Sequence, residues 1–143
     1  PKTYPLPHPK VEGSPYDFSF SGLKTAVLNT LNHAAQKGET IIKEDLCASF
    51  QQTVCDLIAG KLMLAAEEFG YKKIVFAGGV SANSGLRARL TAECQKRDYE
   101  FFVPPLSLCG DNAAMIGAQA YYEYLAGNFA GADLNAVASK NIE

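Results

Sequence analysis

The spacing of apolar residues predicts two helices in the first half of the chain. The first helix begins after Phe20 and should end at Gly38. The second should end at Gly70, and Glu44 and Asp45 suit the positive, N-terminal end of its helix dipole. The apolar stripe of the first helix is Leu23, Val27, Leu31 and Ala34. That of the second, over about seven turns, is Leu46, Phe50, Val54, Leu57, Ile58, Ala65 and Phe69. We expect the second helix to be largely buried.

The periodicity changes in the second half. Residues 73–77 form a β-branched and aromatic run that ends at two glycines, which is typical of a buried parallel strand. Ser81 is placed to cap a helix that runs to Arg97. Residues 99–103 predict a second strand before two prolines, and a last helix should run from near Asp111 to Gly127.

This order, α-α-β-α-β-α, predicts an α/β fold with two parallel strands joined by a right-handed crossover. Two strands are too few for a free-standing parallel sheet. Either a further strand lies in the N-terminal third, or the sheet is completed by another part of a larger protein. The first residue, Pro1, is not a Met, and residues 1–15 hold five of the seven prolines, which favours the second alternative. We therefore expect an extended linker at 1–15 and one lobe of a larger protein at 16–143.

Composition narrows the class of protein. With 143 residues, 48% of them apolar, and a formal charge of −2, the chain can form one core and is neither a disordered polyelectrolyte nor a generally basic nucleic-acid binder. Charged residues interrupt the longest apolar stretch, 57–69, which is shorter than the roughly 20 residues of a membrane-spanning helix. The four cysteines show no CxxC pair, so we expect a reduced, cytoplasmic protein in which Cys47 and Cys55 are buried.

The turn after the first strand is a candidate ligand site. Gly78 and Gly79 let the backbone approach a ligand, and the helix that follows presents free N–H groups to an anion. Asn83 could bind a ribose, a base or a carbonyl through either end of its amide. The alternative is a plain tight turn in which Asn83 caps the helix.

A second candidate lies after the second strand. Asp111 starts an otherwise small and apolar helix at the carboxyl end of a strand, where open α/β sheets bind ligands. Its carboxylate could coordinate a metal ion, although an ordinary N-cap is the commoner role for such an Asp.

Other polar residues give weaker signals. Lys24, in the segment 18–25, could contact a phosphate or an RNA backbone, while Phe18 and Phe20 could simply pack on the core. Neither His8 nor His33 has a partner histidine at ligand spacing. Four basic residues of the helix after the glycines form either a modest basic patch or an ordinary solvated face: Arg87, Arg89, Lys96 and Arg97.

Taken together, four segments carry a specific resemblance. They are FSFSGLKTA (18–26), DLCASFQQTV (45–54), FAGGVSAN (76–83) followed by Leu86 and Arg87, and CGDNAAMIG (109–117). In this order they closely resemble the TsaD family, also called Gcp or YgjD. These are tRNA N6-adenosine threonylcarbamoyltransferases, once described as O-sialoglycoprotein endopeptidases. Only the C-terminal part of the family pattern is present.

The resemblance implies a two-lobed fold of the actin, sugar-kinase and Hsp70 type (ASKHA, ribonuclease H-like), of which this chain is the C-terminal lobe. It implies transfer of a threonylcarbamoyl group from threonylcarbamoyl-AMP to N6 of the adenosine 3′ of the tRNA anticodon. By motif match, Asn83 contacts the adenylate over a backbone bed formed by Gly78 and Gly79. Asp111 is one ligand of a divalent iron or zinc ion.

The two histidine ligands implied for that metal lie outside this chain, since neither His8 nor His33 matches them. The 143 residues alone are therefore expected not to turn over. The partners implied are tRNA, the missing N-terminal lobe, a paralogous dimerisation subunit and a small ATPase, and no membrane. Two rival functions are a metalloendopeptidase, disfavoured because HExxH is absent, and a non-catalytic nucleotide-binding module.

Overall fold

The computed structural model describes residues 3–9 and 11–138. The chain divides into two compact units, residues 1–109 and 110–143, and each is described by itself. Parts of the predicted linker (1–2 and 10) and of the predicted lobe (139–143) lie outside the described residues.

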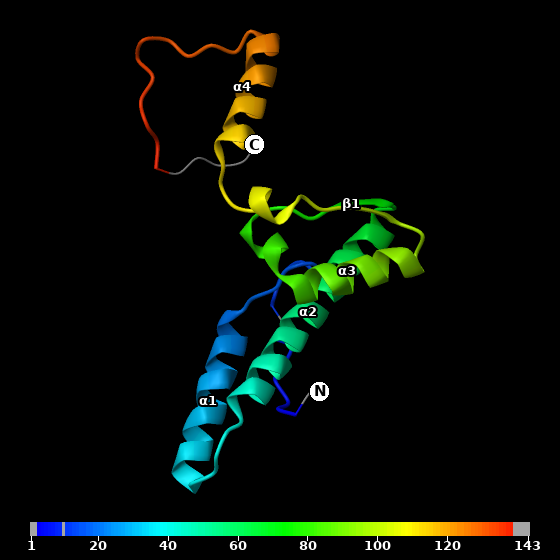
Figure 1. Ribbon diagram of the computed structural model, residues 1–143, viewed down its shortest axis with the longest axis vertical. Coiled ribbons are helices and arrows are strands. Elements are labelled where there is room, and N and C mark those ends of the chain that lie inside the picture. Colours follow the sequence, from blue (N-terminus) through cyan, green and yellow to red (C-terminus); the bar gives the residue numbers. More distant parts are fainter. Residues whose placement is uncertain (1–2, 10, 139–143) are drawn as a thin grey trace. The chain divides into compact units, whose positions relative to one another are not determined.

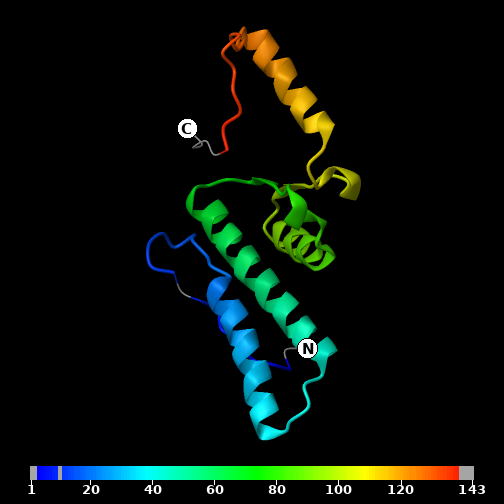
Figure 2. The same cartoon turned by 90° about the vertical axis from the view of Figure 1, so that its left-hand side faces the viewer.

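The first unit begins with a helical hairpin. Helices α1 (Ser21–Lys37) and α2 (Lys43–Glu68) lie side by side in both views (Figures 1 and 2). Gly38 ends α1 in the left-handed conformation, with φ 67°, as the sequence predicted. Among the described residues, no helix combines the length and the apolar character that crossing a bilayer requires.

A small parallel sheet follows the hairpin. Strands β1 (Lys73–Val75) and β2 (Glu100–Phe102) pair in parallel with Ile74 opposite Phe101, and α3 (Ser84–Lys96) connects them. The mixed α/β class and the parallel pairing are therefore confirmed. The sheet has two strands in the described part of the chain, and neither comes from the N-terminal third.

The core lies where α2 and α3 meet one face of this sheet. Leu86 and Leu90 of α3 are completely buried against small or flexible residues of α2 and against Ile74 of β1. The α2 residues in this cluster are Cys55, Ala59, Met63 and Ala66. The other face of the sheet is open, because Val75 and Phe102 are exposed.

The predicted apolar stripe of α2 is only partly correct. Leu46 and Leu57 are buried, but Phe50 and Phe69 are exposed. The α2 face that packs on α3 and the sheet instead carries Cys55, Ala59, Met63 and Ala66, and the small side chains among them let the two helices approach closely. The expectation that Cys47 is buried was wrong. Cys55 lies on the α2 face that packs on α3 and is buried, whereas Cys47 does not lie on this face and is exposed.

The N-terminal segment makes specific contacts with the hairpin. Its described residues contain no helix or strand, but Leu6 is buried. The backbone N–H of Tyr4 donates to Ser49 Oγ at 3.1 Å, and the Tyr4 hydroxyl accepts from the N–H of Ile42 at 3.1 Å. These hydrogen bonds hold the segment against the start of α2 and the residue that precedes it.

The second unit contains one helix, α4 (Ala113–Ala126), in its described part. Gly127 ends it in the left-handed conformation at φ 73°, as predicted. The apolar residues of α4, including Ile116 and Tyr122, are exposed within this unit.

We expect Leu90→Ala to lower the free energy of unfolding by about 2–5 kcal/mol, because it leaves a cavity among side chains that are close-packed. Leu64→Ala is the matched control: Leu64 is 42% exposed on α2. It should cost about 1 kcal/mol, clearly less than Leu90→Ala, because Leu64 is only partly buried. Urea unfolding of both variants measures the difference, and equal losses would show that the α2–α3 contact does not form the core.

Candidate functional site

The glycine turn after β1 forms a compact backbone loop. Gly78 has φ 84° and ψ 174°, a conformation that disfavours any residue with a side chain. The chain then makes a 3-10 turn, Gly79–Ala82, in which the N–H of Ser81 donates to the carbonyl oxygen of Gly78 at 2.9 Å. Gly78 and Gly79 are exposed, and nothing lies within 4 Å of a Cβ built on either, so their backbone is accessible to a ligand.

The residue that caps α3 is Asn83 and not, as predicted, Ser81. The Asn83 Oδ1 atom accepts from the N–H of Leu86 at 3.0 Å. The extra 3-10 turn delays the start of the helix, so Ser81 is carried into the interior. Its hydroxyl is buried and has no hydrogen-bond partner among the described residues.

Capping leaves the other end of the Asn83 amide free. Its Nδ2 group makes no hydrogen bond to another described residue, and the side chain is exposed. Asn83 can therefore act on a ligand as a hydrogen-bond donor while its oxygen orients the amide. The capping role and the ligand role, which the sequence set as alternatives, are compatible.

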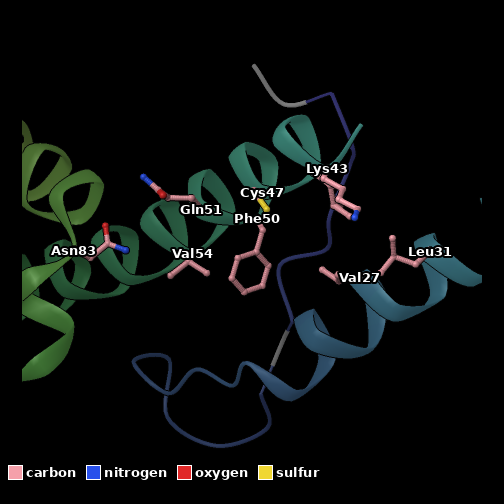
Figure 3. Close-up of a pocket in the computed structure, with 9 residues that line it drawn as sticks. Val27, Leu31, Lys43, Cys47, Phe50, Gln51, Val54 and Asn83 are labelled. Carbon is pink, nitrogen blue, oxygen red and sulfur yellow. The ribbon is translucent and has the colours of Figure 1, made fainter. Parts of the chain in front are cut away.

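Asn83 lies at one end of a largely apolar groove between α1 and α2 (Figure 3). The groove has a volume of about 620 Å³. Figure 3 shows Val27 and Leu31 on α1 and Phe50 on α2 along it, with Gln51 between them and Asn83. Phe50 and Val54, which the sequence placed in the buried stripe of α2, thus line this groove and are not part of the core.

Asp111 is not a helix cap. The cap of α4 is Asn112, whose Oδ1 accepts from the N–H of Met115 at 3.2 Å. Asp111 precedes it, is exposed, and makes no hydrogen bond or ion pair to another described residue. Its carboxylate is thus free to bind a cation. Asp111 belongs to the second unit and Asn83 to the first, so the two are described separately.

Arg87 has a role that the sequence did not reveal. Its Nε donates to the carbonyl oxygen of Ser81. Its Nη2 donates to the carbonyl oxygen of Pro104 at 2.7 Å and to Cys109 Sγ at 2.9 Å. The guanidinium therefore joins the glycine turn to the segment that follows β2, and we call this set of contacts the Arg87 clasp.

The other basic residues of α3 form ion pairs and not a free basic patch. Arg89 lies 3.5 Å from Asp56 of α2 and from Glu93, and Lys96 lies 3.3 Å from Glu93. Arg97 contacts both Glu67 and Glu93 at 2.6 Å. Hydrogen bonds from Arg97 and then Lys96 lower the pKa of Glu93. The alternative of an ordinary solvated face therefore holds for Arg89, Lys96 and Arg97, but Arg87 fits neither alternative.

The weaker candidates do not converge on a site. Lys24 borders an apolar hollow with Phe20 and Phe50. Phe18 and Phe20 contact each other, with ring centroids 5.4 Å apart, but both are exposed and so do not pack in the core. In the part of the chain that the structure describes, no three His, Cys, Asp or Glu side chains are grouped as a metal would require.

Comparison with known proteins decides the family. The family model TsaD, described as tRNA N6-adenosine threonylcarbamoyltransferase, matches residues 2–118. The chain belongs to the TsaD family. The enzyme of this name from Bacillus thuringiensis strain Al Hakam is 51% identical over 142 residues, which is 99% of this chain and 41% of that protein. Those of Limosilactobacillus reuteri DSM 20016 and Halalkalibacterium halodurans are 50% and 48% identical over 94% and 99% of the chain.

The chain thus spans about two fifths of the length of these TsaD relatives, covering 40% and 41% of the first two named. The match includes the glycine turn, Asn83, the Arg87 clasp and Asp111, which all lie within residues 2–118. The geometric features described above therefore lie within the part of the chain that the family model matches.

We expect Asn83→Ala to destabilise the fold by about 1 kcal/mol through loss of the cap of α3. Asn83→Asp should retain most of the stability, because a carboxylate oxygen can accept from the N–H of Leu86, but it loses the Nδ2 donor. Urea unfolding of the two variants measures the capping role separately from any ligand role. Equal destabilisation by Ala and Asp would contradict the cap.

The lowered pKa of Glu93 predicts a pH dependence of stability. An ionised Glu93 is favoured in the folded state, so its contribution is present above the ordinary pKa of 4.5 and is lost as pH falls through the lowered value. The difference in urea midpoint between the natural chain and Glu93→Gln should be constant near pH 7 and shrink below pH 4.5. Glu100→Gln, which removes an exposed pair with Lys73, is the control and should change little. A Glu93→Gln difference that grows in acid would contradict this assignment.

Proposed function

We propose that this chain acts as part of a tRNA N6-adenosine threonylcarbamoyltransferase, which transfers a threonylcarbamoyl group from threonylcarbamoyl-AMP to N6 of the adenosine 3′ of the anticodon. The observation that carries the proposal is the match to proteins of that name, at about half identity over nearly the whole chain. The accessible glycine turn, the free Asn83 donor and the unpaired Asp111 carboxylate support it.

In this proposal residues 16–143 are the C-terminal lobe of an actin-like, ASKHA-type fold, and the N-terminal lobe comes from elsewhere in the longer protein. Two observations support it. The two-stranded sheet is smaller than free-standing sheets usually are. Its outer face and the apolar surface of α4 are exposed in their own units, as expected of surfaces that a further lobe would cover.

We assign binding of the adenylate to the glycine turn. The backbone of Gly78 and Gly79 can approach the ligand closely, and the N-terminal end of α3 favours the negative charge of its phosphate. The Nδ2 of Asn83 donates a hydrogen bond to the ligand, while its Oδ1 stays on the N–H of Leu86. Because the cap fixes the amide, little side-chain freedom is lost on binding.

We assign Asp111 as one ligand of a divalent iron or zinc ion, with two histidines outside this chain as the others. The exposed carboxylate fits this role, because it neither caps α4 nor pairs with another described residue. A bound metal would supply Lewis-acid polarisation of the carbamoyl group. Since a single carboxylate is a weak site, the chain alone should retain little metal.

The reaction needs no nucleophilic side chain from this chain. The N6 amine of the adenosine forms a bond to the carbamoyl carbon, the bond from that carbon to the phosphate oxygen breaks, and AMP leaves while N6 loses a proton. The role of Gly78, Gly79 and Asn83 is to hold the adenylate so that its carbamoyl carbon is presented to the amine.

We carry the proposed partners over from the family resemblance. We propose that tRNA binds with basic surface supplied largely by other parts of the assembly, because the charges of α3 are paired within the chain. A paralogous dimerisation subunit and a small ATPase would complete the system, in the cytoplasm, where tRNA is modified.

The test uses the full-length protein with its partner proteins, tRNA and threonylcarbamoyl-AMP, and follows the modified adenosine by mass spectrometry. We expect transfer by the natural protein and a loss of at least about a hundredfold for Asp111→Ala, together with a lower metal content. Asp133→Ala is the matched control, since Asp133 is also an exposed Asp of the second unit.

Three outcomes would contradict the proposal. They are cleavage of a sialoglycoprotein without tRNA modification, nucleotide binding without transfer, and unchanged metal content and transfer in Asp111→Ala. Transfer by the 143 residues without any other polypeptide would contradict the proposed need for a second lobe.

A further inference from the structure

We propose that Arg87 is a positioning residue of the glycine turn, whose guanidinium holds the turn that carries Asn83 against the segment that follows β2. The expected effect of Arg87 on catalysis rests on the proposed function. The contacts from which its positioning role is argued all lie within the first unit. The residue does not touch the ligand in this proposal. It acts through the two segments it joins.

The Arg87 clasp joins parts of the chain that are distant in sequence. The carbonyl oxygen of Ser81 lies inside the 3-10 turn directly before Asn83. Pro104 and Cys109 bracket the short 3-10 turn Leu106–Leu108 that follows β2. One side chain therefore contacts both the β1–α3 connection and the segment that follows β2.

The chemistry of these contacts requires an arginine. Its guanidinium is a planar fork whose N–H groups point in fixed, divergent directions, so Nε can serve one segment while Nη2 serves the other. A lysine ammonium is a single point and cannot span both segments with the same geometry. Ser81 is also completely buried, so its carbonyl oxygen needs a donor, because an unpaired backbone group away from water is costly.

Cys109 completes the arrangement. It is buried, its Sγ accepts from Arg87 Nη2 at 2.9 Å, and its thiol donates to the carbonyl oxygen of Pro105 at 3.3 Å. Cys109 is the last residue of the first unit, two positions before Asp111. The clasp thus holds the last residue of the first unit.

The partners of Arg87 are neutral, which separates it from its neighbours on α3. Within the described residues, its acceptors are two carbonyl oxygens and a thiol, whereas Arg89 and Arg97 pair with carboxylates. Surface ion pairs account for the positions of the Arg89 and Arg97 side chains but not for that of Arg87. A cation held among neutral acceptors next to the glycine turn also favours an anionic ligand, so the experiment must separate charge from geometry.

The test compares Arg87→Lys, which keeps the charge, with Arg87→Met, which removes it, in the full-length protein. Arg89→Lys is the control, because Arg89 lies on the same helix and is 42% exposed. AMP is the probe, its dissociation constant is measured by calorimetry, and amide hydrogen exchange is followed in residues 78–83 and 104–109.

We expect both Arg87 variants to weaken AMP binding by about tenfold and to raise KM for threonylcarbamoyl-AMP in proportion, because misplaced binding groups lose affinity. Amide exchange should become faster in both segments at once. Arg89→Lys should stay within about twofold in affinity, as expected for an exposed ion pair. AMP affinity and exchange in Arg87→Lys equal to those of the natural protein, with a loss only in Arg87→Met, would show that charge and not the clasp matters and would overturn the proposal.

A second variant covers the case in which the Arg87 substitutions do not fold. Cys109→Ala removes one acceptor and leaves the arginine in place, and we expect faster exchange in 104–109. Unchanged exchange there would overturn the clasp. Failure of the proposed function is a separate result: the natural protein would then lack transfer, while the exchange measurements would still decide the role of Arg87.

Discussion

The close packing of α3 on α2 is the contact on which the rest of the first unit depends. Leu86 and Leu90 fill the space left by Cys55, Ala59 and Met63, and this fixes α3 across one face of the sheet. Since α3 connects β1 to β2, its position also sets the parallel pairing of Ile74 with Phe101. Asn83 caps the start of the same helix, so the geometry of the glycine turn depends on this core.

The sequence predicted the elements well because their signals are local. Glycines at 38, 70 and 127 end helices, and the β-branched run at 73–77 contains the strand Lys73–Val75. The predicted cap was wrong because Ser81 and Asn83 are both good capping residues, and only the 3-10 turn after Gly78 decides between them. For Asp111 the neighbouring Asn112 decides in the same way.

Contacts between segments that are distant in the chain could not be predicted from the sequence. The stripe that included Phe50 has the correct helical period, but burial on α2 depends on which face meets α3, and that face is lined by small residues. The sequence could not distinguish Arg87 from Arg89, Lys96 and Arg97, because all four are basic residues of one predicted helix. Its distinct role depends on acceptors at Pro104 and Cys109, which come close only after both strands have paired.

The position of these polar contacts has a physical consequence for the site. A hydrogen bond from Asn83 to a ligand contributes most to affinity when the glycine turn already has its bound conformation, because less ordering is then needed on binding. That turn has two supports: the cap on Leu86 holds the amide to α3, and the Arg87 clasp holds the carbonyl oxygen of Ser81. Both supports originate from α3, whose buried leucines lock it to the core. The stability of the hydrophobic core and the order of the candidate site are therefore coupled through a single helix.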